Sequence, residues 1–400
     1  MYYIRNLESK LLKAVEQFPV VTLTGPRQAG KTTTLKKLFS NSYKYVTLDS
    51  PEIFRLASED PRQFLSIYKS PVIIDEVQKA PELLSYIKEM VDNNRDKNGQ
   101  FIITGSQNLL LSQKVSESLA GRTAVLKLLP FTYREVQQNP AKAFPWEIEH
   151  LSTSGTSVED YWNLFIRGFY PGVINNDIDI NLWHSSYIQT YIERDVRSIK
   201  QISDLLTFQN FLIMLASRSG QLLNLANISR DLGVTLNTCK SWLNILEATY
   251  QVIVLRPYFE NVGKRLIKTP KVYFTDTGTL CHLLRISESA QASMGPFAGA
   301  IFETAVVGEI YKTLLSRGID PRIYFWRTSS GTEVDMIISE GLSLIPLEIK
   351  SSATVNKEMA KNVKVFMRDY DKSSDGYIIT LGDMILPVAH NITALGFASL

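Results

Sequence analysis

The sequence has few of the residues that mark secreted, metal-binding or membrane-spanning chains. Among its 400 residues are two cysteines and four histidines, and the histidines are scattered. One cysteine pair does not make a disulfide framework, and the sequence holds no Cys/His cluster with metal-ligand spacing. The apolar runs are far too short to span a bilayer, and the N-terminus lacks the apolar core of a signal peptide. We therefore expect a cytoplasmic chain without a membrane partner.

An excess of charge of one sign is also missing. The 43 basic and 40 acidic residues leave a formal net charge of +3, which is too small to indicate nucleic acid or membrane binding by itself. Hydrophobic residues make up 44% of the chain and charged residues 21%, which is typical of soluble globular domains. The length is enough for about two to four domains.

What the sequence does contain is a phosphate-binding loop near its start. The β-branched run over 20–24 predicts a buried strand, which leads into GPRQAGKT, a match to G-x-x-x-x-G-K-[ST]. The two glycines let backbone N–H groups close around a polyphosphate, and a helix expected over 33–39 points its positive end at the same place. We expect Lys31 to reach the β- and γ-phosphates and Thr32 to offer its hydroxyl to Mg²⁺. The predicted ATP-binding residues are Gly25, Pro26, Arg27, Gln28, Ala29, Gly30, Lys31, Thr32 and Thr33.

Two acidic residues follow the next strongly apolar strand. Residues 72–74 are Val-Ile-Ile, and Asp75 and Glu76 come directly after them, about 45 residues beyond the loop. In a P-loop ATPase, an acid at the end of such a strand holds Mg²⁺, directly or through water. The acid after it polarises the attacking water. We expect Asp75 and Glu76 to take these two roles.

Two further polar positions are candidates for the same site. The strand expected over 101–104 leads to Ser106, with Gln107 and Asn108 directly after it, and a polar residue there contacts the γ-phosphate or the attacking water. Capping of the next helix is the alternative, since Ser and Asn are good helix caps. Arg122 is a candidate cation for transition-state charge, in its own subunit or from a neighbouring one. An ordinary surface or ion-paired arginine is the alternative there.

Strands and helices alternate over this first part of the chain. That alternation predicts a parallel sheet with right-handed crossovers, whose ligands bind at the carboxyl ends of the strands. Gly25, Asp75 and Ser106 all come at such ends. The three motifs therefore predict one site.

The middle of the chain predicts helices and then a small sheet. The charges of YIERDVR at 191–197 alternate in sign, which indicates a solvated face, with nucleotide sensing from a lid as the alternative. Residues 222–248 predict helix, turn, helix, and strands are expected at 252–255 and 271–274. This order resembles a winged helix-turn-helix, but the second helix carries few residues suited to reading bases, so a protein-interaction module is the alternative to DNA contact. The residues that could meet phosphates are Lys240, Lys264, Arg265 and Lys268.

Acidic residues and a lysine gather again in the C-terminal third. Strand alternation puts Glu348 and Lys350 on one face of the strand over 344–350, and Asp335 on the neighbouring strand can join them. Two carboxylates and a lysine suit metal-dependent phosphodiester cleavage, in which the acids hold Mg²⁺ and the lysine orients or activates water. Glu303, on the helix before these strands, adds a fourth candidate. Charged residues on an edge strand often produce the same pattern without any chemistry.

Taken together, these motifs resemble one prokaryotic family of AAA-type P-loop ATPases. The matching stretches are TGPRQAGKTTT, VIIDEVQ, ITGSQ, LAGRT, YIERDVR, VYFTDTG and GTEVDMII…PLEIKSS. The resemblance implies ATP binding with slow hydrolysis, homo-oligomer formation, a winged-helix region and a C-terminal domain similar to the PD-(D/E)XK nuclease fold. It divides the chain into an ATPase domain at 1–135, a helical lid at 136–206, a winged-helix-like region at 207–270 and a nuclease-like domain at 271–400. The proline-aspartate dipeptide is absent, since Val334 precedes Asp335.

The sequence therefore predicts an α/β protein with a P-loop parallel sheet, a helical lid, a winged helix and a C-terminal α/β domain. We expect a Mg²⁺-dependent ATPase that couples its nucleotide state to the C-terminal domains. One alternative is an ATP-regulated, metal-dependent DNA nuclease with its centre at Asp335, Glu348 and Lys350. The other is a non-enzymatic switch that binds DNA or protein.

Overall fold

The structure is a computed structural model, and it describes residues 1–105, 115, 117–148, 156–192, 205–260 and 268–400. The chain divides into two compact units. The first holds residues 1–131 with 248–250 and 313–319, and the second holds 132–247, 251–312 and 320–400. No helix within the described residues is long and apolar enough to cross a membrane. Both cysteines are buried and free.

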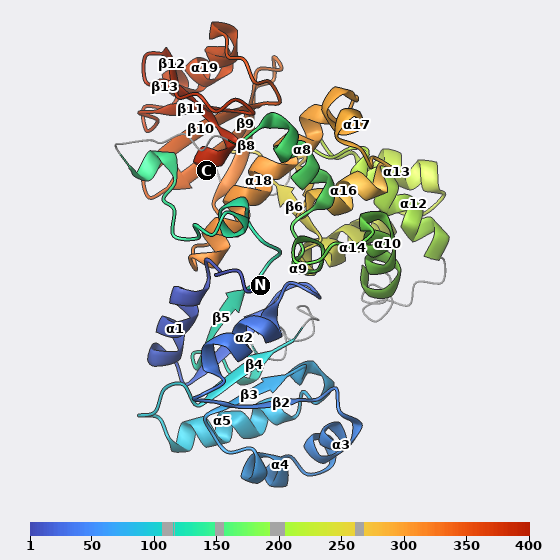
Figure 1. The fold of residues 1–400 in the computed structure, drawn as a ribbon, viewed down its shortest axis with the longest axis vertical. Helices are drawn as coiled ribbons and strands as arrows, with labels where there is room; N and C mark the ends of the chain where they lie inside the picture. The colour runs from blue at the N-terminus through green and yellow to red at the C-terminus, as the bar shows by residue number, and fades with distance from the viewer. Residues whose placement is uncertain (106–114, 116, 149–155, 193–204, 261–267) are drawn as a thin grey trace. The chain divides into compact units, whose positions relative to one another are not determined.

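The first unit is built on a five-stranded parallel sheet, drawn in blue to green in Figure 1. The strand order is β2-β3-β4-β1-β5, so β4 lies between β1 and β3. The strands are β1 (Val20–Thr24), β2 (Lys44–Thr47), β3 (Val72–Asp75), β4 (Phe101–Thr104) and β5 (Thr123–Lys127). The helices are α1 (Glu8–Gln17), α2 (Lys31–Phe39), α3 (Pro51–Glu59), α4 (Pro61–Ile67) and α5 (Leu83–Asn93).

Both faces of this sheet are buried, which explains why its central strands are apolar without alternation. Successive side chains of a strand point to opposite faces. On one face, Val20 and its neighbours pack with the side chains of α4 and α5. On the other face, Val21 and Leu23 pack with α1 and α2. The carboxyl ends of β1, β3 and β4 therefore come together at one edge of a rigid sheet.

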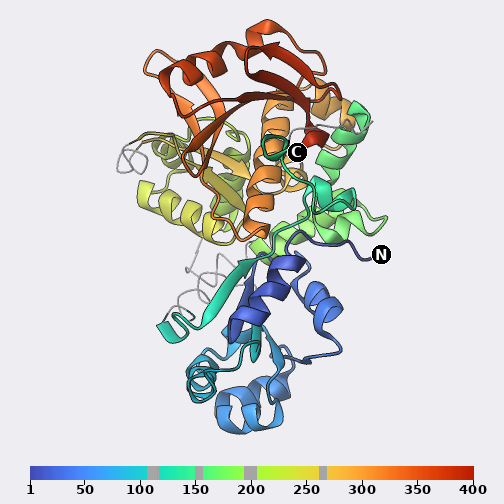
Figure 2. The ribbon, with the colours of Figure 1, turned by 90° about the vertical axis from the view of Figure 1, so that its left-hand side faces the viewer.

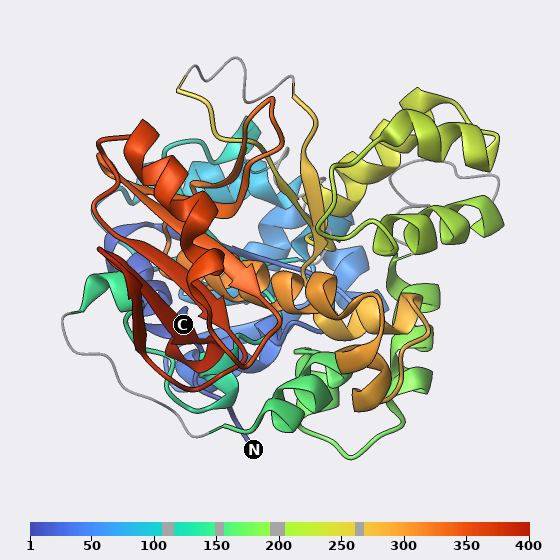
Figure 3. The ribbon, with the colours of Figure 1, turned by 90° about the horizontal axis from the view of Figure 1, so that it is seen from above.

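The second unit begins with helices that lead to a small sheet. These are α7 (Tyr133–Val136), α8 (Val158–Arg167), α9 (Pro171–Ile174), α10 (Ile180–Tyr187), α12 (Leu205–Ala216), α13 (Leu225–Leu232) and α14 (Leu236–Ala248). Asn224 caps the start of α13, and Gly233, with φ of 68°, ends it in the left-handed conformation before α14 begins. The antiparallel strands β6 (Val252–Leu255) and β7 (Lys271–Phe274) follow, and Leu222 bridges to Lys271. In Figure 3 the yellow-green helices lie beside these yellow strands.

The C-terminal part of the second unit is a six-stranded mixed sheet with the order β12-β13-β11-β10-β9-β8. Its strands are β8 (Ile323–Arg327), β9 (Glu333–Glu340), β10 (Ser343–Lys350), β11 (Gly376–Thr380), β12 (Leu386–Ala389) and β13 (Ile392–Gly396). The helices α16 (Thr277–Leu283), α17 (Ser289–Met294) and α18 (Ala298–Ser316) precede it, and α19 (Lys361–Asp369) connects β10 to its parallel neighbour β11. Figure 2 shows α18 in orange alongside the red strands.

The structure confirms the predicted α/β class. The first sheet is parallel throughout, and a separate mixed sheet forms the C-terminal part. The strands predicted around the loop and the acidic pair are β1 and β3.

Candidate nucleotide site and a buried acidic cluster

The phosphate loop connects β1 to α2 and depends on two glycines. Gly25 has φ of +145°, and a Cβ placed there would lie 2.0 Å from the carbonyl oxygen of Leu128. Gly30 has φ of +94° and precedes the first residue of α2. Any side chain at position 25 would collide with the backbone that follows β5, so the sequence requirement for glycine there is steric.

Lys31 folds back over the loop. Its side chain is buried, and its ammonium donates hydrogen bonds to the carbonyl oxygens of Gly25 and Pro26, each at 2.9 Å. The charge is therefore held at the loop and does not enter the apolar core. Since phosphate oxygens are stronger acceptors for an ammonium than neutral carbonyls, this lysine is placed to exchange one set of oxygens for another.

The structure brings Thr32 and Asp75 together. The Thr32 hydroxyl donates to Asp75 Oδ2 at 2.8 Å, and the Tyr45 hydroxyl donates to the same oxygen at 2.6 Å. Asp75 is 5% exposed, and its Oδ1 accepts the backbone N–H of Glu76 at 3.1 Å. Burial and the hydrogen bond to Asp75 raise the pKa of Tyr45, so the phenol stays protonated and remains a donor. A hydroxyl and a carboxylate thus lie side by side, which fits the oxygen ligands of Mg²⁺.

Glu76 adopts an uncommon backbone conformation for a non-glycine residue. Its φ of 57° and ψ of 39° place it in the left-handed region, directly after β3. Gln78 Nε2 donates a hydrogen bond to Glu76 Oε2. Such backbone strain concentrates at functional sites, so this turn is consistent with a residue placed for chemistry.

Ser106, Gln107 and Asn108 lie outside the described residues. Arg122 is described, and its guanidinium binds the Asp92 carboxylate through Nε at 2.8 Å and Nη2 at 3.0 Å. The carbonyl of Arg122 accepts a hydrogen bond from the N–H of Val20, so Arg122 lies at the amino end of β1. The phosphate loop begins at the carboxyl end of the same strand. From the first residue of β1 to the last, four residues further on, a strand rises about 13 Å. The structure therefore does not bring Arg122 to the loop of its own chain, because the residue before a parallel strand lies at the opposite edge of the sheet.

Two residues of this site were missed from the sequence. Tyr45 carries no motif that would place it at the site, because the pairing of β2 with β3 is not visible in the sequence. Arg5 is 4% exposed, and its guanidinium donates to the carbonyl of Ala29 in the loop at 2.9 Å and to that of Leu129 at 2.6 Å. No local motif marks Arg5 as a support of the loop.

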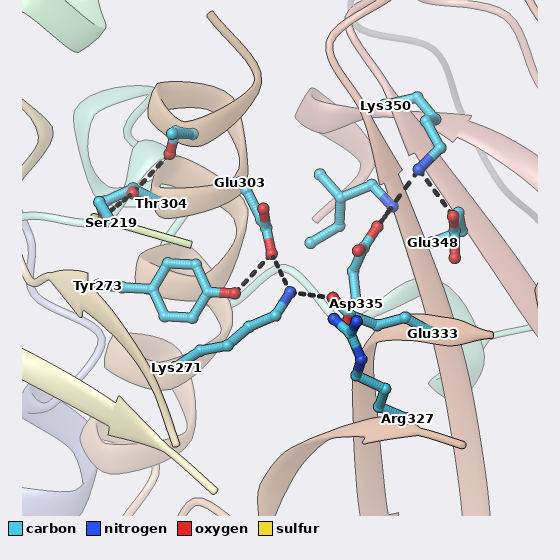
Figure 4. Close-up of polar contacts among 12 residues, drawn as sticks. Ser219, Lys271, Tyr273, Glu303, Thr304, Arg327, Glu333, Asp335, Glu348 and Lys350 are labelled. Atoms are coloured by element: carbon cyan, nitrogen blue, oxygen red, sulfur yellow. Dashed lines mark hydrogen bonds and ion pairs between the residues drawn. The ribbon is translucent and has the colours of Figure 1, made fainter. Parts of the chain in front are cut away.

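The second candidate site lies on β9 and β10, where Asp335, Glu348 and Lys350 do meet (Figure 4). Leu347 is opposite Met336 in the register, so Glu348 comes next to Asp335. Lys350 Nζ lies 2.7 Å from Glu348 Oε1 and 3.6 Å from Asp335 Oδ2. The Ile349 N–H donates to Asp335 Oδ2 at 2.8 Å. The other oxygen of the 4% exposed Glu348, Oε2, is buried and has no hydrogen-bond partner among the residues that the structure describes.

Crowding of carboxylates changes their proton affinity. Burial, and then the charge of Asp335, raise the pKa of Glu348 to about 8. The same two causes raise the pKa of Glu303 to about 7. Burial opposes the charge of Lys350, but the carboxylates of Asp335 and Glu348 outweigh it and raise the pKa of this lysine. Near neutral pH the cluster therefore holds protons that exposed carboxyl groups would have released.

Glu303 joins the cluster from α18, but its direct partners are residues that the sequence did not indicate. Lys271 Nζ lies 3.2 Å from Glu303 Oε1 and 2.6 Å from Glu333 Oε1. The Tyr273 hydroxyl also donates to Glu303 Oε1, and Arg327 Nη1 lies 2.8 Å from Glu333 Oε2. Figure 4 shows Lys271 between the two carboxylates. The Lys271 side chain is 4% exposed.

Across the described ranges, no three or more His, Cys, Asp or Glu side chains are arranged to hold a metal ion. At the loop and at Asp335 and Glu348, the protein offers one or two carboxylates. That number suits an octahedral cation such as Mg²⁺ or Mn²⁺, which keeps waters or substrate phosphates as its other ligands.

The basic residues predicted to meet nucleic acid are only partly described. Lys240 on α14 and Lys268 before β7 are exposed. Lys264 and Arg265 lie outside the described residues, as does most of YIERDVR.

Comparison with known proteins finds matches to family models over most of the chain. Residues 17–137 match the model of an AAA domain, so the part that carries the loop is similar to AAA domains. Residues 158–290 and 298–400 match two domains of unknown function, DUF8612 and DUF4143.

Relatives are known over nearly the whole length. An uncharacterized protein of Mycobacterium tuberculosis, Rv2008c, is 33% identical over 355 residues, which cover 88% of this chain and 74% of the relative. An uncharacterized protein of Haemophilus influenzae is 21% identical, covering 92% of this chain and 91% of the relative. Among solved structures, the Walker-type ATPase PABY2304 of Pyrococcus abyssi aligns with a TM-score of 0.43 at 16% identity, covering 69% of this chain and 94% of that one.

Proposed function

The chain belongs to the family of the uncharacterized mycobacterial protein Rv2008c, and we propose that it acts as a Mg²⁺-dependent ATPase. The observation that carries the proposal is the meeting of Thr32 and Asp75, 2.8 Å apart, beside a loop on which Lys31 is folded. Thr32 lies in the first turn of α2 and Asp75 ends β3, and the two residues are 43 apart in the sequence. Their juxtaposition supplies the charge and the oxygen ligands that a metal-bound triphosphate requires.

Each group of the site has a distinct role in this proposal. The loop backbone and Lys31 bind the phosphates, and Thr32 and Asp75 hold the metal. Mg²⁺, when bound, neutralises negative charge on the phosphates. Glu76 accepts a proton from the attacking water and orients it. Tyr45 and the Glu76 N–H fix the Asp75 carboxylate, so that its orientation does not have to be found during each turnover.

The test is phosphate release by the purified full chain and by its Glu76→Gln variant. Glutamine keeps an oxygen to accept from Gln78 but cannot take up a proton. We expect turnover to fall by about 100-fold or more, as for loss of a general base, with ATP affinity unchanged. Glu82→Gln, a nearby acid outside the site, is the matched control. Unchanged turnover in Glu76→Gln would refute the assignment.

The nucleotide state is proposed to act on the C-terminal parts of the chain. The order α12, α13, α14, β6, β7, with Leu222 bridged to β7, supports a winged-helix assignment for this segment. Its exposed Lys240 and Lys268 would meet DNA phosphates. Binding of labelled duplex DNA at several salt concentrations, with and without ATP, tests this partner. A homo-oligomer in which Arg122 reaches a neighbour's loop belongs to the same proposal, and light scattering with and without ATP tests it.

The buried acidic cluster supports a second candidate function, metal-dependent cleavage of a phosphodiester. The observation in its favour is the unpartnered Oε2 of Glu348 next to Asp335, since two crowded carboxylates with a free oxygen fit a hard divalent cation. Asp335 and Glu348 would hold Mg²⁺, which would polarise the phosphoryl oxygen, and Lys350 would orient water.

One incubation separates these functions from a non-enzymatic switch. The protein is mixed with ATP, Mg²⁺ and plain DNA, and phosphate release and strand breakage are scored together. Strand breakage that disappears in Asp335→Asn and in Lys350→Met would support the nuclease. A binding switch would show neither reaction and would retain ATP-sensitive binding.

A further inference from the structure

Lys271 places a buried positive charge inside the acidic cluster. It is the first residue of β7, and its ammonium lies between Glu303 of α18 and Glu333 of β9, at 3.2 and 2.6 Å. Burial would lower the pKa of this lysine, but the nearby carboxylates of Glu303, Asp335 and Glu333 outweigh it and raise the pKa. The ammonium therefore stays charged while almost wholly shielded from solvent.

The charges of the cluster are nearly balanced without a metal. Its side chains comprise four carboxyl groups and three cations, contributed by Glu303, Glu333, Asp335, Glu348, Lys271, Arg327 and Lys350, so the carboxylates exceed the cations by only one even when every carboxyl group is ionised. A divalent cation added to this set would overcompensate the carboxylates. If the Lys271 charge were removed, the fully ionised carboxyl groups would exceed the cations by two, which is the charge of one divalent ion.

We propose that Lys271 is a built-in cation that excludes divalent metal from the acidic cluster, and that metal binds only when a movement of β7 takes this lysine out of the cluster. This inference rests on the second candidate function, because it concerns the regulation of the same cluster. Lys271 holds Glu303 and Glu333 in ion pairs, and Tyr273, two residues further along β7, holds Glu303 from the same side (Figure 4). One strand, β7, thus supplies both the ammonium and the hydroxyl that bind the Glu303 carboxylate.

The place of β7 in the fold shows which part of the chain would control the cluster. β7 pairs with β6, which follows α14, and Leu222, just ahead of α13, bridges to Lys271 itself. The helix-turn-helix segment and the metal-excluding lysine are therefore parts of one hydrogen-bonded assembly. A partner that binds this segment and shifts β7 would open the cluster to metal.

The test measures Mn²⁺ binding to the full chain by the loss of the free-ion EPR signal. All proteins carry Asp75→Asn, so that the nucleotide site contributes no Mn²⁺ affinity. Lys271→Met removes the charge and keeps most of the side-chain length, Lys271→Arg keeps the charge, and Lys271→Gln is a second neutral variant. We expect both neutral variants to bind Mn²⁺ about tenfold or more tightly than the parent, because an unpaired buried carboxylate strongly favours a counter-ion. Lys271→Arg should bind as weakly as the parent.

A melting curve of each protein with and without Mn²⁺ gives a second readout that does not depend on activity. Mn²⁺ should raise the melting temperature of Lys271→Met more than that of the parent, and adding Glu333→Gln should abolish the gain in affinity. Equal, tight binding by the parent and Lys271→Met would overturn the inference and leave the metal site standing. Absence of Mn²⁺ binding in every protein would overturn both the inference and the nuclease proposal.

Discussion

The Asp75→Asn substitution separates metal binding from folding at the nucleotide site. Asp75 accepts three hydrogen bonds, from the Thr32 hydroxyl at 2.8 Å, the Tyr45 hydroxyl at 2.6 Å and the Glu76 N–H at 3.1 Å. An asparagine can turn its oxygen to the Glu76 N–H and its NH₂ group to the two hydroxyls, which then rotate to accept. The buried hydrogen bonds are all retained in this arrangement, so we expect a change in unfolding free energy of no more than about 1 kcal/mol.

The effect on Mg²⁺ should be much larger than the effect on stability. Loss of a group that merely supports a metal ligand commonly costs about 10- to 100-fold in metal affinity or activity. Asp75 is proposed to hold the metal itself, so its loss should cost at least about 100-fold in ATP turnover at fixed Mg²⁺. Tyr45→Phe removes only a supporting hydrogen bond, and we expect it to raise the Mg²⁺ requirement about tenfold.

The assay is ATP turnover measured over a range of Mg²⁺ concentrations, alongside denaturant unfolding of each variant. Tyr45→Phe should approach the wild-type rate at high Mg²⁺, whereas Asp75→Asn should not. Tyr43→Phe, which loses a hydroxyl that donates to the Gly99 carbonyl, is the matched control. Turnover by Asp75→Asn at the wild-type rate and Mg²⁺ requirement would refute the role of this carboxylate.

The other predictions concern the loop, the acidic cluster and the core of the second unit. Lys31→Met should abolish ATP binding in calorimetry while the fold, followed by circular dichroism, persists; retained affinity would contradict the role of the ammonium. The pKa of Glu348, raised to about 8, means that the folded state binds more protons than the unfolded state from about pH 4.5 upward. Stability from this group is therefore present at low pH and lost as pH rises to about 8, so unfolding in urea with EDTA should show a smaller fall from pH 5 to pH 8 in Glu348→Gln than in wild type. Arg134 and Glu309 are each 1% exposed and 3.4 Å apart, so Arg134→Met should lower the unfolding free energy by about 3–5 kcal/mol, and adding Glu309→Gln should restore part of the loss.

The arrangement of the candidate nucleotide site could be predicted because its main residues lie in short, contiguous motifs. The loop, Lys31, Thr32 and Asp75 needed only the strand before each motif and the rule that parallel strands end at one edge. For Arg122 the sequence left three interpretations open, its own loop, a neighbour's loop and an ordinary ion pair, and the structure shows an ion pair with Asp92. Arg122 comes before a strand, and residues before parallel strands lie at the amino edge of the sheet.

The contacts that could not be predicted are those that depend on which elements become neighbours. Tyr45 reaches Asp75 only because β2 pairs with β3 in one register. Lys271 looks like an ordinary strand residue, and its charge has meaning only once α18 and β9 bring Glu303 and Glu333 against it. The pairing of β9 with β10 did allow Asp335 and Glu348 to be grouped from the sequence, since a hairpin makes consecutive strands adjacent.

The measurement that tests the central claim most directly is calorimetric titration of the full chain with ATP, in Mg²⁺ and in EDTA, beside Lys31→Met. We predict saturable binding of about one ATP per chain, weaker in EDTA and absent in the variant, as the loop geometry requires. Absence of binding by the wild-type chain, or equal binding by Lys31→Met, would contradict the assignment of this loop as a nucleotide site.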